Sequence, residues 1–289
     1  MIYLNGDFMP LEQARIPVLD RGFIFGDGVY EVIPVYSRRA FRLPGHLARL
    51  QASLDAISIE NPHAGEKWRE LIERIVAENP WEDQAVYLQV TRGVAKRDHT
   101  FVRGVAPTVF IMSNPLVTPS ADVVKNGGAA IVRPDFRWLR CDIKTTSLLG
   151  NCMLRTEAAD AGCTEAILVR EGFLTEASAS NVFVVKDGTV LAPPKSHLML
   201  PGITYDVVLE LLAGNGVPHA VRPVAESELR AADEIWVTSS SREVMAITTL
   251  DGKAVGRGEH AGRPGPVFAR VYALYQQYKA KVMRAPVHA

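Results

Sequence analysis

The stretch RWLRCDIKTTSLLGN, residues 137–151, most constrains the fold because it places a single lysine, Lys144, before a helical pattern. The pattern predicts that Lys144 lies at the end of a buried strand, where the helix begins. Such a lysine is either a surface side chain whose ammonium reaches solvent or a desolvated amine that acts as a nucleophile. Apolar neighbours and the arginines at 137 and 140 would disfavour the ammonium. A neutral amine is the form that reacts with an aldehyde.

The 289-residue chain has an ordinary globular composition, with 47% apolar and 22% charged residues. Its length suits one large domain or two medium ones. Lysine plus arginine equals aspartate plus glutamate at 32 each, so no overall charge favours nucleic acid or an anionic membrane. The N-terminus has no signal-peptide pattern, and no apolar run approaches the roughly 20 residues of a transmembrane helix. Three cysteines without CxxC spacing predict a cytoplasmic protein.

Short strands and helices are expected in the first third of the chain. Asn5-Gly6 favours the positive φ angles of a type I′ hairpin turn. Apolar residues between 68 and 76 recur at helical spacing, which is typical of an amphipathic helix. The expected elements are hairpins at residues 1–10 and 28–43, helices at 44–57 and 65–80, and strands at 84–93 and 107–113.

Residues 114–122 contain two prolines and little periodicity, which predicts a linker between domains at 1–114 and 123–289. Several strands of the second domain are joined as hairpins, which disfavours a doubly wound parallel sheet. We therefore expect two α/β or α+β domains with mixed sheets. The elements expected after the linker are strands within 128–136, 165–177, 180–194 and 234–240, and helices at 147–162, 203–216 and 264–283.

Common motifs of phosphate, zinc and ester chemistry are missing from the sequence: there is no GxxxxGK[ST], HExxH or GxSxG. Gly256, Gly258 and Gly262 approach a dinucleotide-binding fingerprint, but no strand precedes them and no helix follows. No histidine pair has metal-ligand spacing. The sequence predicts no metal site.

Two stretches could hold a phosphate. In MLPGITYDVV, Gly202 permits close backbone approach, and Ile203 and Thr204 open a helix whose first amides favour an anion. VTSSSRE, residues 237–243, places three hydroxyls, including that of Ser240, at a strand end. Arg49, in GHLARLQAS, would add a cation. Each pattern alone also fits an ordinary helix start, turn or surface charge.

Two further stretches could bind charged groups. Glu176, in FLTEASASNVF, follows a strand, where a carboxylate is costly unless it has a partner such as a protonated ring nitrogen. The alternative is an exposed glutamate in a turn. Arg97 and His99 lie two residues apart on the loop at 94–104, where a guanidinium and an imidazole can bind a carboxylate. The alternative is a solvated polar loop.

In this order, the stretches resemble the fold-type IV pyridoxal-phosphate enzymes, the family of D-amino-acid and branched-chain aminotransferases and aminodeoxychorismate lyase. The resemblance runs nearly the whole length. It is strongest to the bacterial D-amino-acid branch, through DRGFIFGDGVYEV, HLARL, TRGVAKRDHTF, RWLRCDIKTTSLLGN, GCTEAILVREGFLTEASASNVF, LPGIT and VTSSSRE. It implies a smaller N-terminal α/β domain, a larger C-terminal pseudo-barrel, pyridoxal 5′-phosphate between them, and a homodimer.

The resemblance also implies roles for individual residues. Lys144 would form the Schiff base with the cofactor and shuttle the substrate proton. Glu176 would bind the pyridine nitrogen, and Leu200 would pack against the ring. The phosphate would be held by Arg49, Ile203, Thr204 and Ser240, and the substrate α-carboxylate by Tyr30, Arg97 and His99.

The implied reaction is transamination between a D-amino acid, such as D-alanine, and a 2-oxo acid, such as 2-oxoglutarate. A branched-chain L-amino-acid aminotransferase and an aminodeoxychorismate-type lyase remain alternatives on the same fold, and a non-catalytic cofactor-binding protein is a third. Some positions depart from the family pattern and bear on side-chain specificity more than on the reaction type. They are Ala177 and Ala179 where glycine or serine is common, Tyr205 in place of arginine, and Lys96 in place of proline.

Overall fold

The computed structural model describes residues 1–284, which form two compact units. Unit 1 comprises Met1–Val117 and Ile143–Leu148; unit 2 comprises Thr118–Asp142 and the described residues from Leu149 onward. The predicted division assigned 123–289 to one continuous domain, whereas the structure groups six of those residues, with Lys144 among them, with unit 1.

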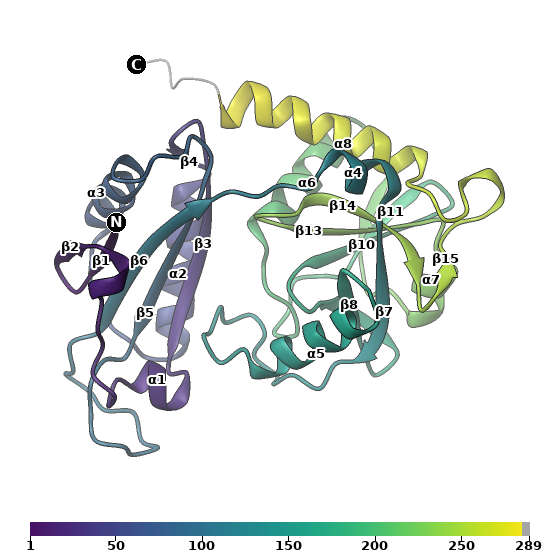
Figure 1. Cartoon of the computed structure of the whole chain (residues 1–289). Coiled ribbons are helices and arrows are strands. Elements are labelled where there is room, and N and C mark those ends of the chain that lie inside the picture. Colours follow the sequence, from purple (N-terminus) through teal and green to yellow (C-terminus); the bar gives the residue numbers. More distant parts are fainter. Residues whose placement is uncertain (285–289) are drawn as a thin grey trace. The chain divides into compact units, whose positions relative to one another are not determined.

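Unit 1 is built on a single sheet with helices beside it (Figure 1). Within the described residues, its elements are β1 (Ile2–Leu4), β2 (Asp7–Met9), a 3₁₀ turn (Leu11–Gln13), α1 (Arg21–Phe25), β3 (Gly28–Tyr36), β4 (Arg39–Ala40), α2 (Leu43–Ala56), α3 (Gly65–Ala77), β5 (Gln84–Thr91) and β6 (Thr108–Pro115).

The unit 1 sheet has the strand order β2-β1-β6-β5-β3-β4, and all of its neighbouring strands run antiparallel. The sequence predicted mixed sheets in both domains, so this unit differs from that expectation. Both expected hairpins are confirmed. Asn5 and Gly6, with φ of 50° and 113°, join β1 to β2, and Ser37 and Arg38, with φ of 48° and 62°, join β3 to β4.

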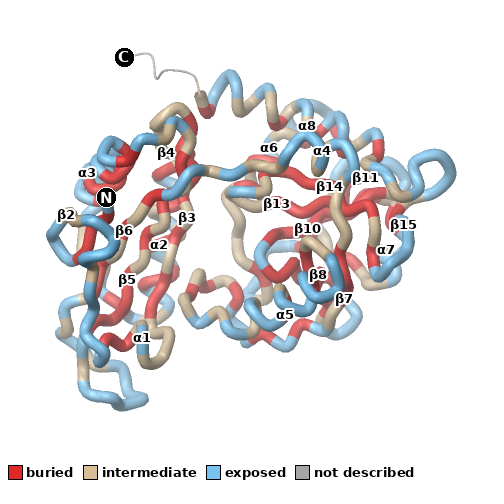
Figure 2. Tube along the Cα trace, viewed as in Figure 1, coloured by how far each residue is buried: buried red, intermediate tan, exposed pale blue. Residues whose placement is uncertain are grey.

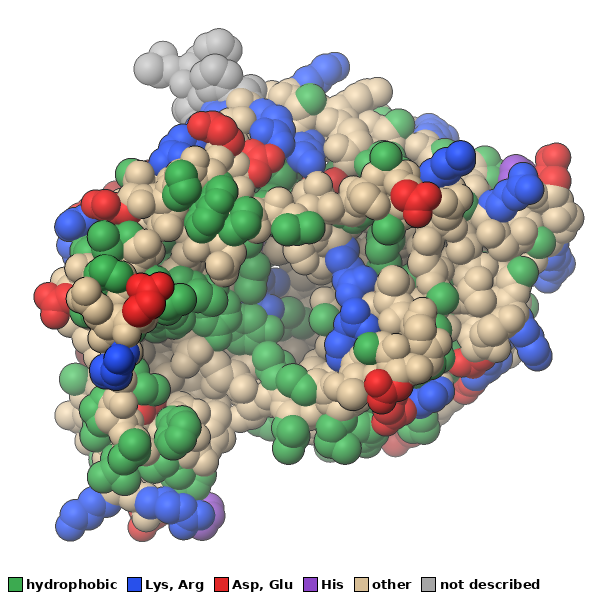
Figure 3. Space-filling model, in the orientation of Figure 1, with side chains coloured by type: hydrophobic (Ala, Val, Ile, Leu, Met, Phe, Trp, Pro, Cys, Tyr) green, Lys and Arg blue, Asp and Glu red, His purple; other side chains and the backbone are tan. Residues whose placement is uncertain are grey.

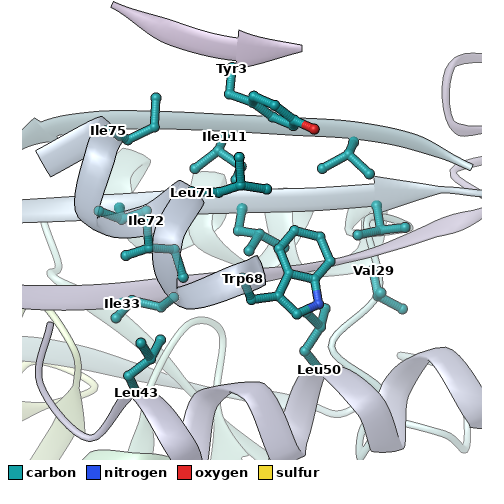
Figure 4. Close-up of a cluster of buried hydrophobic side chains, with 14 of the residues drawn as sticks. Tyr3, Val29, Ile33, Leu43, Leu50, Trp68, Leu71, Ile72, Ile75 and Ile111 are labelled. Carbon is teal, nitrogen blue, oxygen red and sulfur yellow. The ribbon is translucent and has the colours of Figure 1, made fainter. Parts of the chain in front are cut away.

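Helices α2 and α3 pack on one face of this sheet and form its core (Figure 4). The helical spacing predicted for residues 65–80 is confirmed, because the large apolar residues of α3 are all buried. Proline lies in the first turn of α2, as expected. The labelled core side chains come from β1, β3, β6 and both helices: Tyr3, Val29, Ile33, Leu43, Leu50, Trp68, Leu71, Ile72, Ile75 and Ile111.

Unit 2 contains the larger sheet (Figure 1). Its described elements are α4 (Ala121–Asn126), β7 (Gly128–Pro134), α5 (Leu149–Asp160), β8 (Glu165–Arg170), β9 (Phe173–Ala177), β10 (Asn181–Lys186), β11 (Thr189–Ala192), α6 (Ile203–Gly214), β12 (His219–Val221), α7 (Glu226–Arg230), β13 (Glu234–Ser239), β14 (Glu243–Leu250), β15 (Lys253–Ala254), a 3₁₀ turn (Gly258–His260), α8 (Pro266–Tyr278) and a π-helical turn (Lys279–Met283).

The unit 2 sheet is mixed, as predicted, and it curves around a core. Its strand order is β12-β11-β10-β13-β14-β7-β8-β9, with β15 paired to β14. The pairs β11–β12, β14–β7 and β7–β8 are parallel. Apolar residues from both ends of this order, on β8 and β9 and on β10 and β11, meet in one buried cluster, which confirms the pseudo-barrel expected for this domain. Figure 2 shows these strands as largely buried.

Helices cover the outside of the unit 2 sheet. Leu154 and Ala158 of α5 pack against β7 and β8 on the face opposite the main cluster. Tyr205 of α6 stacks on Phe183 of β10, with ring centroids 5.1 Å apart. Its hydroxyl donates to the carbonyl of Pro193 at 2.7 Å, so this departure from the family pattern is a buried packing residue.

The segment predicted to be a linker at 114–122 is partly structured. β6 extends to Pro115, and α4 begins at Ala121. The Ser120 hydroxyl accepts a hydrogen bond from the Val123 N–H at 3.3 Å and caps that helix.

The prediction that Lys144 ends a strand was wrong. β7 ends at Pro134, and α5 begins at Leu149, so Lys144 lies in an irregular connection between them. The apolar residues of this connection alternate as in a strand, but they do not share one buried face. Leu139 is exposed, whereas Ile143 is buried in the core of unit 1.

The surface carries both signs of charge. In the view of Figure 3, Lys and Arg side chains and Asp and Glu side chains occur over each unit, in keeping with the formal net charge of zero. Among residues 1–284, none of the helices combines the length and the apolar character needed to cross a membrane.

Candidate active site

The backbone of Lys144 is held by the open edge of β3. The Tyr30 N–H donates to the Lys144 carbonyl at 2.9 Å, and the Thr146 N–H donates to the Gly28 carbonyl at 3.0 Å. The Lys144 N–H donates to the Ser53 hydroxyl of α2 at 3.2 Å. Both backbone polar groups of the lysine are therefore bonded within unit 1, and this fixes where its side chain begins.

The Lys144 side chain is half-buried and lies over an aromatic ring. Its Nζ atom is 4.2 Å from the centroid of the Tyr30 ring, a distance at which the ring face attracts a cation. Tyr30 stacks in turn on Tyr87, with centroids 5.6 Å apart. Two residues proposed from the sequence for different roles, Lys144 and Tyr30, are thus in direct contact.

Arg49 belongs to a buried cluster with Glu31 and His46. The Arg49 Nε and Nη2 atoms donate to the two oxygens of Glu31 at 2.7 and 2.8 Å. His46 Nδ1 is 2.8 Å from Glu31 Oε2, and both of these side chains are fully buried. Burial alone raises the pKa of Glu31, but the Arg49 charge and the hydrogen bonds outweigh it and lower that pKa to about 2. Glu31 is therefore an ionised buried carboxylate.

Burial lowers the pKa of His46, which favours its neutral form. The neutral ring donates its Nδ1 proton to the ionised Glu31, so Nε2 is an acceptor. Among the described residues, this buried Nε2 atom has no hydrogen-bond partner. The two hydrogen bonds from Arg49 to Glu31 use two of the five N–H donors of the guanidinium.

Arg97 and His99 are exposed and flank one aromatic ring. The Arg97 guanidinium is 5.3 Å from the centroid of Phe25, and the His99 ring is 5.6 Å from it. The sequence predicted that these side chains lie on a loop between two strands, and they do, between β5 and β6.

The base of this loop is held by a buried carboxylate, Asp27. Its Oδ2 atom accepts from Nε of both Arg21 and Arg92 at 2.7 Å. Arg21 Nη1 also donates to the carbonyl of Asp98 at 2.6 Å, between the two predicted substrate ligands. Arg92 lies 3.9 Å from the centroid of Phe101 at the far side of the loop. These contacts connect the loop to the sheet.

Glu176 is a buried residue of β9, so the alternative of an exposed turn is wrong. Arg137 Nη1 donates to Glu176 Oε1 at 2.6 Å. The Leu200 N–H and Asn181 Nδ2 donate to Oε2 at 3.1 and 3.4 Å. Burial raises the pKa of Glu176 to about 7, and the Arg137 charge acts in the opposite direction.

The start of α6 lies next to this carboxylate group. Asn181 Nδ2 donates to the Leu200 carbonyl at 2.9 Å, and a Cβ atom on Gly202 would lie 2.0 Å from Asn181 Oδ1. Glycine is required here for close approach, as the sequence suggested. Ile203 and Thr204 begin the helix, where backbone N–H groups have no intrahelical acceptor.

The hydroxyl-rich turn after β13 borders the same region of unit 2. Ser240 follows the last residue of β13, and Thr238 of that strand is the neighbour of Asn181 across the ladder. Among residues 1–284, the buried Thr238 hydroxyl has no hydrogen-bond partner. Unit 2 thus gathers Glu176, Leu200 and the helix start.

The comparisons with known proteins identify the family of the chain. The model of the family "Amino-transferase class IV" matches residues 28–250. The chain belongs to this family. D-alanine aminotransferase of Bacillus licheniformis is 38% identical over 275 residues, covering 95% of each chain, and that of Listeria monocytogenes is 38% identical over 291 residues, covering 98% and 96%. The solved branched-chain aminotransferase of Thermoproteus uzoniensis with norvaline has a TM-score of 0.83 at 27% identity, covering 96% and 93%.

The residues of this class IV aminotransferase fit pyridoxal 5′-phosphate, the cofactor of the family. Unit 1 offers an amine, Lys144, of fixed backbone position. Unit 2 offers a buried carboxylate, a helix N-terminus and the buried hydroxyl of Thr238 that lacks a partner among the described residues. Taken one by one, an amine binds an aldehyde, a carboxylate binds a ring nitrogen, and a helix N-terminus binds a phosphate.

Several partners of the candidate site residues were not predicted from the sequence. Glu31 lies among apolar residues on the face of β3 that points into the core, and His46 precedes Arg49 by one helical turn. A charged residue on an otherwise apolar face indicates that it is buried with a partner. Arg137 was expected to disfavour the Lys144 ammonium, but it pairs with Asp135 and Glu176. Arg140 likewise pairs with Asp142.

Proposed function

We propose that this class IV aminotransferase exchanges an amino group between a D-amino acid, such as D-alanine, and a 2-oxo acid, such as 2-oxoglutarate. The observation that carries the proposal is the 38% identity to D-alanine aminotransferases over nearly the whole of both chains. Identity to the solved branched-chain aminotransferase of Thermoproteus uzoniensis is lower, at 27%.

Lys144 is the proposed covalent attachment point of the cofactor and the residue that moves the substrate Cα proton. A lysine whose backbone is fixed on both sides can return its Nζ atom to the same place after each proton transfer. Positioned acid–base groups contribute typically ~10²–10⁴-fold to a rate. The Tyr30 ring beneath Nζ restricts the directions in which the amine can move.

Glu176 is the proposed partner of the ring nitrogen, and Leu200 the residue that packs on the ring. When bound, pyridoxal phosphate supplies the electron sink for the reaction. The protein must keep a carboxylate ionised and oriented toward that nitrogen. Arg137, Leu200 and Asn181 donate to the two oxygens of Glu176, and each oxygen has two lone pairs, so acceptor capacity remains.

The proposed phosphate ligands are Arg49, Ile203, Thr204 and Ser240. Charge-assisted hydrogen bonds contribute ~1.5–3 kcal/mol each. Such bonds hold the cofactor in the half-reaction in which Lys144 is released from it. Glu31 orients the Arg49 guanidinium for this role through the fork that joins them.

The substrate carboxylate is the proposed ligand of Tyr30, Arg97 and His99. Arg97 and His99 share contact with Phe25, so the two donors are close to each other on the loop. With the carboxylate pinned and the Cα hydrogen directed at Lys144, only one enantiomer leaves room for its side chain, and the relatives indicate D. We further propose that the enzyme is a cytoplasmic homodimer.

The test is a substrate panel on the purified enzyme loaded with cofactor. D-alanine with 2-oxoglutarate should yield pyruvate and glutamate, whereas L-alanine and L-leucine should yield little. Turnover of L-leucine without D-alanine would favour the branched-chain alternative. Release of pyruvate from an amino-chorismate substrate, without amino transfer, would favour the lyase.

A further inference from the structure

We propose that Arg137 is a positioning residue of this enzyme, which orients the Glu176 carboxylate and balances its charge. The inference rests on the proposed role of Glu176 as the partner of the ring nitrogen. Arg137 would act on the reaction only through Glu176, without contacting the substrate itself.

Arg137 joins two buried carboxylates. Its Nη1 atom donates to Glu176 Oε1 at 2.6 Å. Its Nε and Nη2 atoms donate to the two oxygens of Asp135, each at 2.9 Å. The Arg137 side chain is 5% exposed, Asp135 0% and Glu176 7%, so solvent does not screen these bonds. Breaking such a buried pair leaves an uncompensated charge, which is strongly unfavourable.

Asp135 is itself anchored, and this makes the Arg137 position specific. The Thr175 hydroxyl, next to Glu176 on β9, donates to Asp135 Oδ2 at 2.9 Å. Arg170 lies 3.2 Å from Asp135 and donates to the Arg137 carbonyl at 2.7 Å. The guanidinium is thus held by Asp135 and by the Leu198 carbonyl, to which Nη2 donates at 3.4 Å, and its Nη1 atom donates to Glu176. Lysine could not reproduce this fork.

The charge balance explains why an arginine is needed. A carboxylate buried as deeply as Glu176 tends to take up a proton, and a protonated carboxyl donates where the site requires an acceptor. Burial raises the pKa of Glu176 to about 7, and the neighbouring Arg137 charge opposes that rise. The nearby Asp135 charge also raises the pKa of Glu176, so Arg137, bonded to both carboxylates, is the group that favours the ionised form of Glu176.

Besides Arg137, few groups in the described part of the chain change the pKa of Glu176, and the one other charged group among them is Asp135, which raises it. Cys141 lies in the same connection as Arg137, and burial raises the pKa of its thiol to about 11, so it is uncharged near neutral pH. Leu200 and Asn181 contribute neutral donors. Arg170 reaches Asp135. Among the described residues, Arg137 is therefore the cation that directly bonds Glu176.

The first test uses cofactor-free protein and needs no activity. Infrared difference spectroscopy across a pH titration follows the band of the protonated Glu176 carboxyl, which Glu176→Gln identifies by removing it. Arg137→Met should move the Glu176 midpoint upward by at least about one pH unit, a tenfold change in proton affinity. Arg140→Met, three residues away in an exposed pair with Asp142, is the matched control and should leave the midpoint unchanged.

Arg137→Lys is the conservative variant, included in case Arg137→Met does not fold. It keeps the charge and loses the fork, so its midpoint should move upward by less than that of Arg137→Met, and circular dichroism checks its fold. A Glu176 midpoint that is the same in wild type, Arg137→Lys and Arg137→Met would overturn the proposal. Where Arg137→Met does not fold, the comparison of Arg137→Lys with Arg140→Lys decides, and equal midpoints again overturn it.

The second test uses the loaded enzyme and a double-mutant cycle. Arg137→Met should lower kcat at least about tenfold with KM changed about twofold or less, because the loss is in the reacting state. In a Glu176→Gln background the same change should cost about twofold or less, because its target is gone. Equal losses in both backgrounds would contradict an action through Glu176. If the wild type does not transaminate D-amino acids, the proposed function fails, but the infrared titration midpoint of Glu176 still tests the role of Arg137. The failure of the proposed function and the failure of this inference are therefore distinguishable.

Discussion

The backbone N–H of Tyr30 donates to the backbone carbonyl of Lys144 at 2.9 Å, which places the lysine on the edge of a strand that lies far away in the sequence. The pairing is possible because β4 covers only one end of β3, at Val35 and Tyr36, and leaves the rest of that edge open. An open strand edge is a ready template for another segment. Residues 143–148 use it, and they therefore belong to unit 1 although the chain on both sides belongs to unit 2.

Replacing Gly202 should weaken cofactor binding. In Gly202→Ala the new Cβ would lie 2.0 Å from Asn181 Oδ1, and Asn181 is held by Leu200 and Glu176, so the start of α6 must shift. We expect at least about a tenfold rise in the Kd for pyridoxal phosphate, equivalent to ~1.4 kcal/mol, measured by fluorescence titration of cofactor-free protein.

Gly214→Ala is the matched control, because Gly214 lies in the same helix and no atom approaches the position of its Cβ. That variant should bind the cofactor normally and should be slightly more stable, by ~0.5–1 kcal/mol. Equal Kd values for both variants would show that the close approach at Gly202 does not matter for binding.

Glu31 should contribute a stability that disappears in acid. Its pKa is lowered from 4.5 to about 2 in the folded state, so the folded protein binds fewer protons than the unfolded chain between those values. The contribution is complete above about pH 5 and is lost as the pH falls toward 2. A shift of this size corresponds to ~3 kcal/mol.

The measurement is the free energy of unfolding of wild type and Glu31→Gln by urea at several pH values. The wild type should be more stable near neutral pH, and the difference should shrink between about pH 5 and the lowest pH at which both remain folded. Glu73→Gln, an exposed member of a helix pair on α3, should show almost no pH-dependent difference. A constant difference for Glu31→Gln would mean that its charge is not what stabilises the cluster.

Asp27 should matter for substrate affinity without touching the substrate. In Asp27→Asn, Arg21 and Arg92 lose the negative charge of their shared partner and one of its two acceptor oxygens, so the loop that carries Arg97 and His99 loosens. We expect KM for amino and oxo acids to rise about tenfold, with a smaller change in kcat.

Limited proteolysis of Asp27→Asn should also show faster cleavage within residues 94–104. Asp122→Asn, an exposed residue of α4, is the control for the loss of one carboxylate. Unchanged KM together with unchanged cleavage would show that the Asp27 cluster does not hold the loop.

Local patterns in the sequence predicted local structure well. The spacing of Trp68, Leu71 and Ile72 predicted α3, and Asn5-Gly6 predicted the first hairpin, because helical period and turn chemistry depend on near neighbours. The helix start at Ile203 was predicted for the same reason.

Features that depend on distant partners were not predicted. The alternation of Leu139, Cys141 and Ile143 resembles a strand, but it is residues 143–148 that pair with β3, within unit 1, which no local pattern reveals. Arg137 and Glu176 are 39 residues apart in the chain, and their pairing depends on how β9 lies beside the connection that follows β7. Helix α4 was missed because its six residues carry little periodicity.

Chemical mapping of the cofactor attachment is the most direct measurement. The enzyme loaded with pyridoxal phosphate is reduced with borohydride, digested, and analysed by peptide mass spectrometry. We predict a phosphopyridoxyl label on Lys144, and none at that peptide in Lys144→Ala, which should also lose turnover and the absorbance of the bound cofactor. A label on another lysine, no label at all, or transamination by Lys144→Ala would contradict the proposed role of this residue.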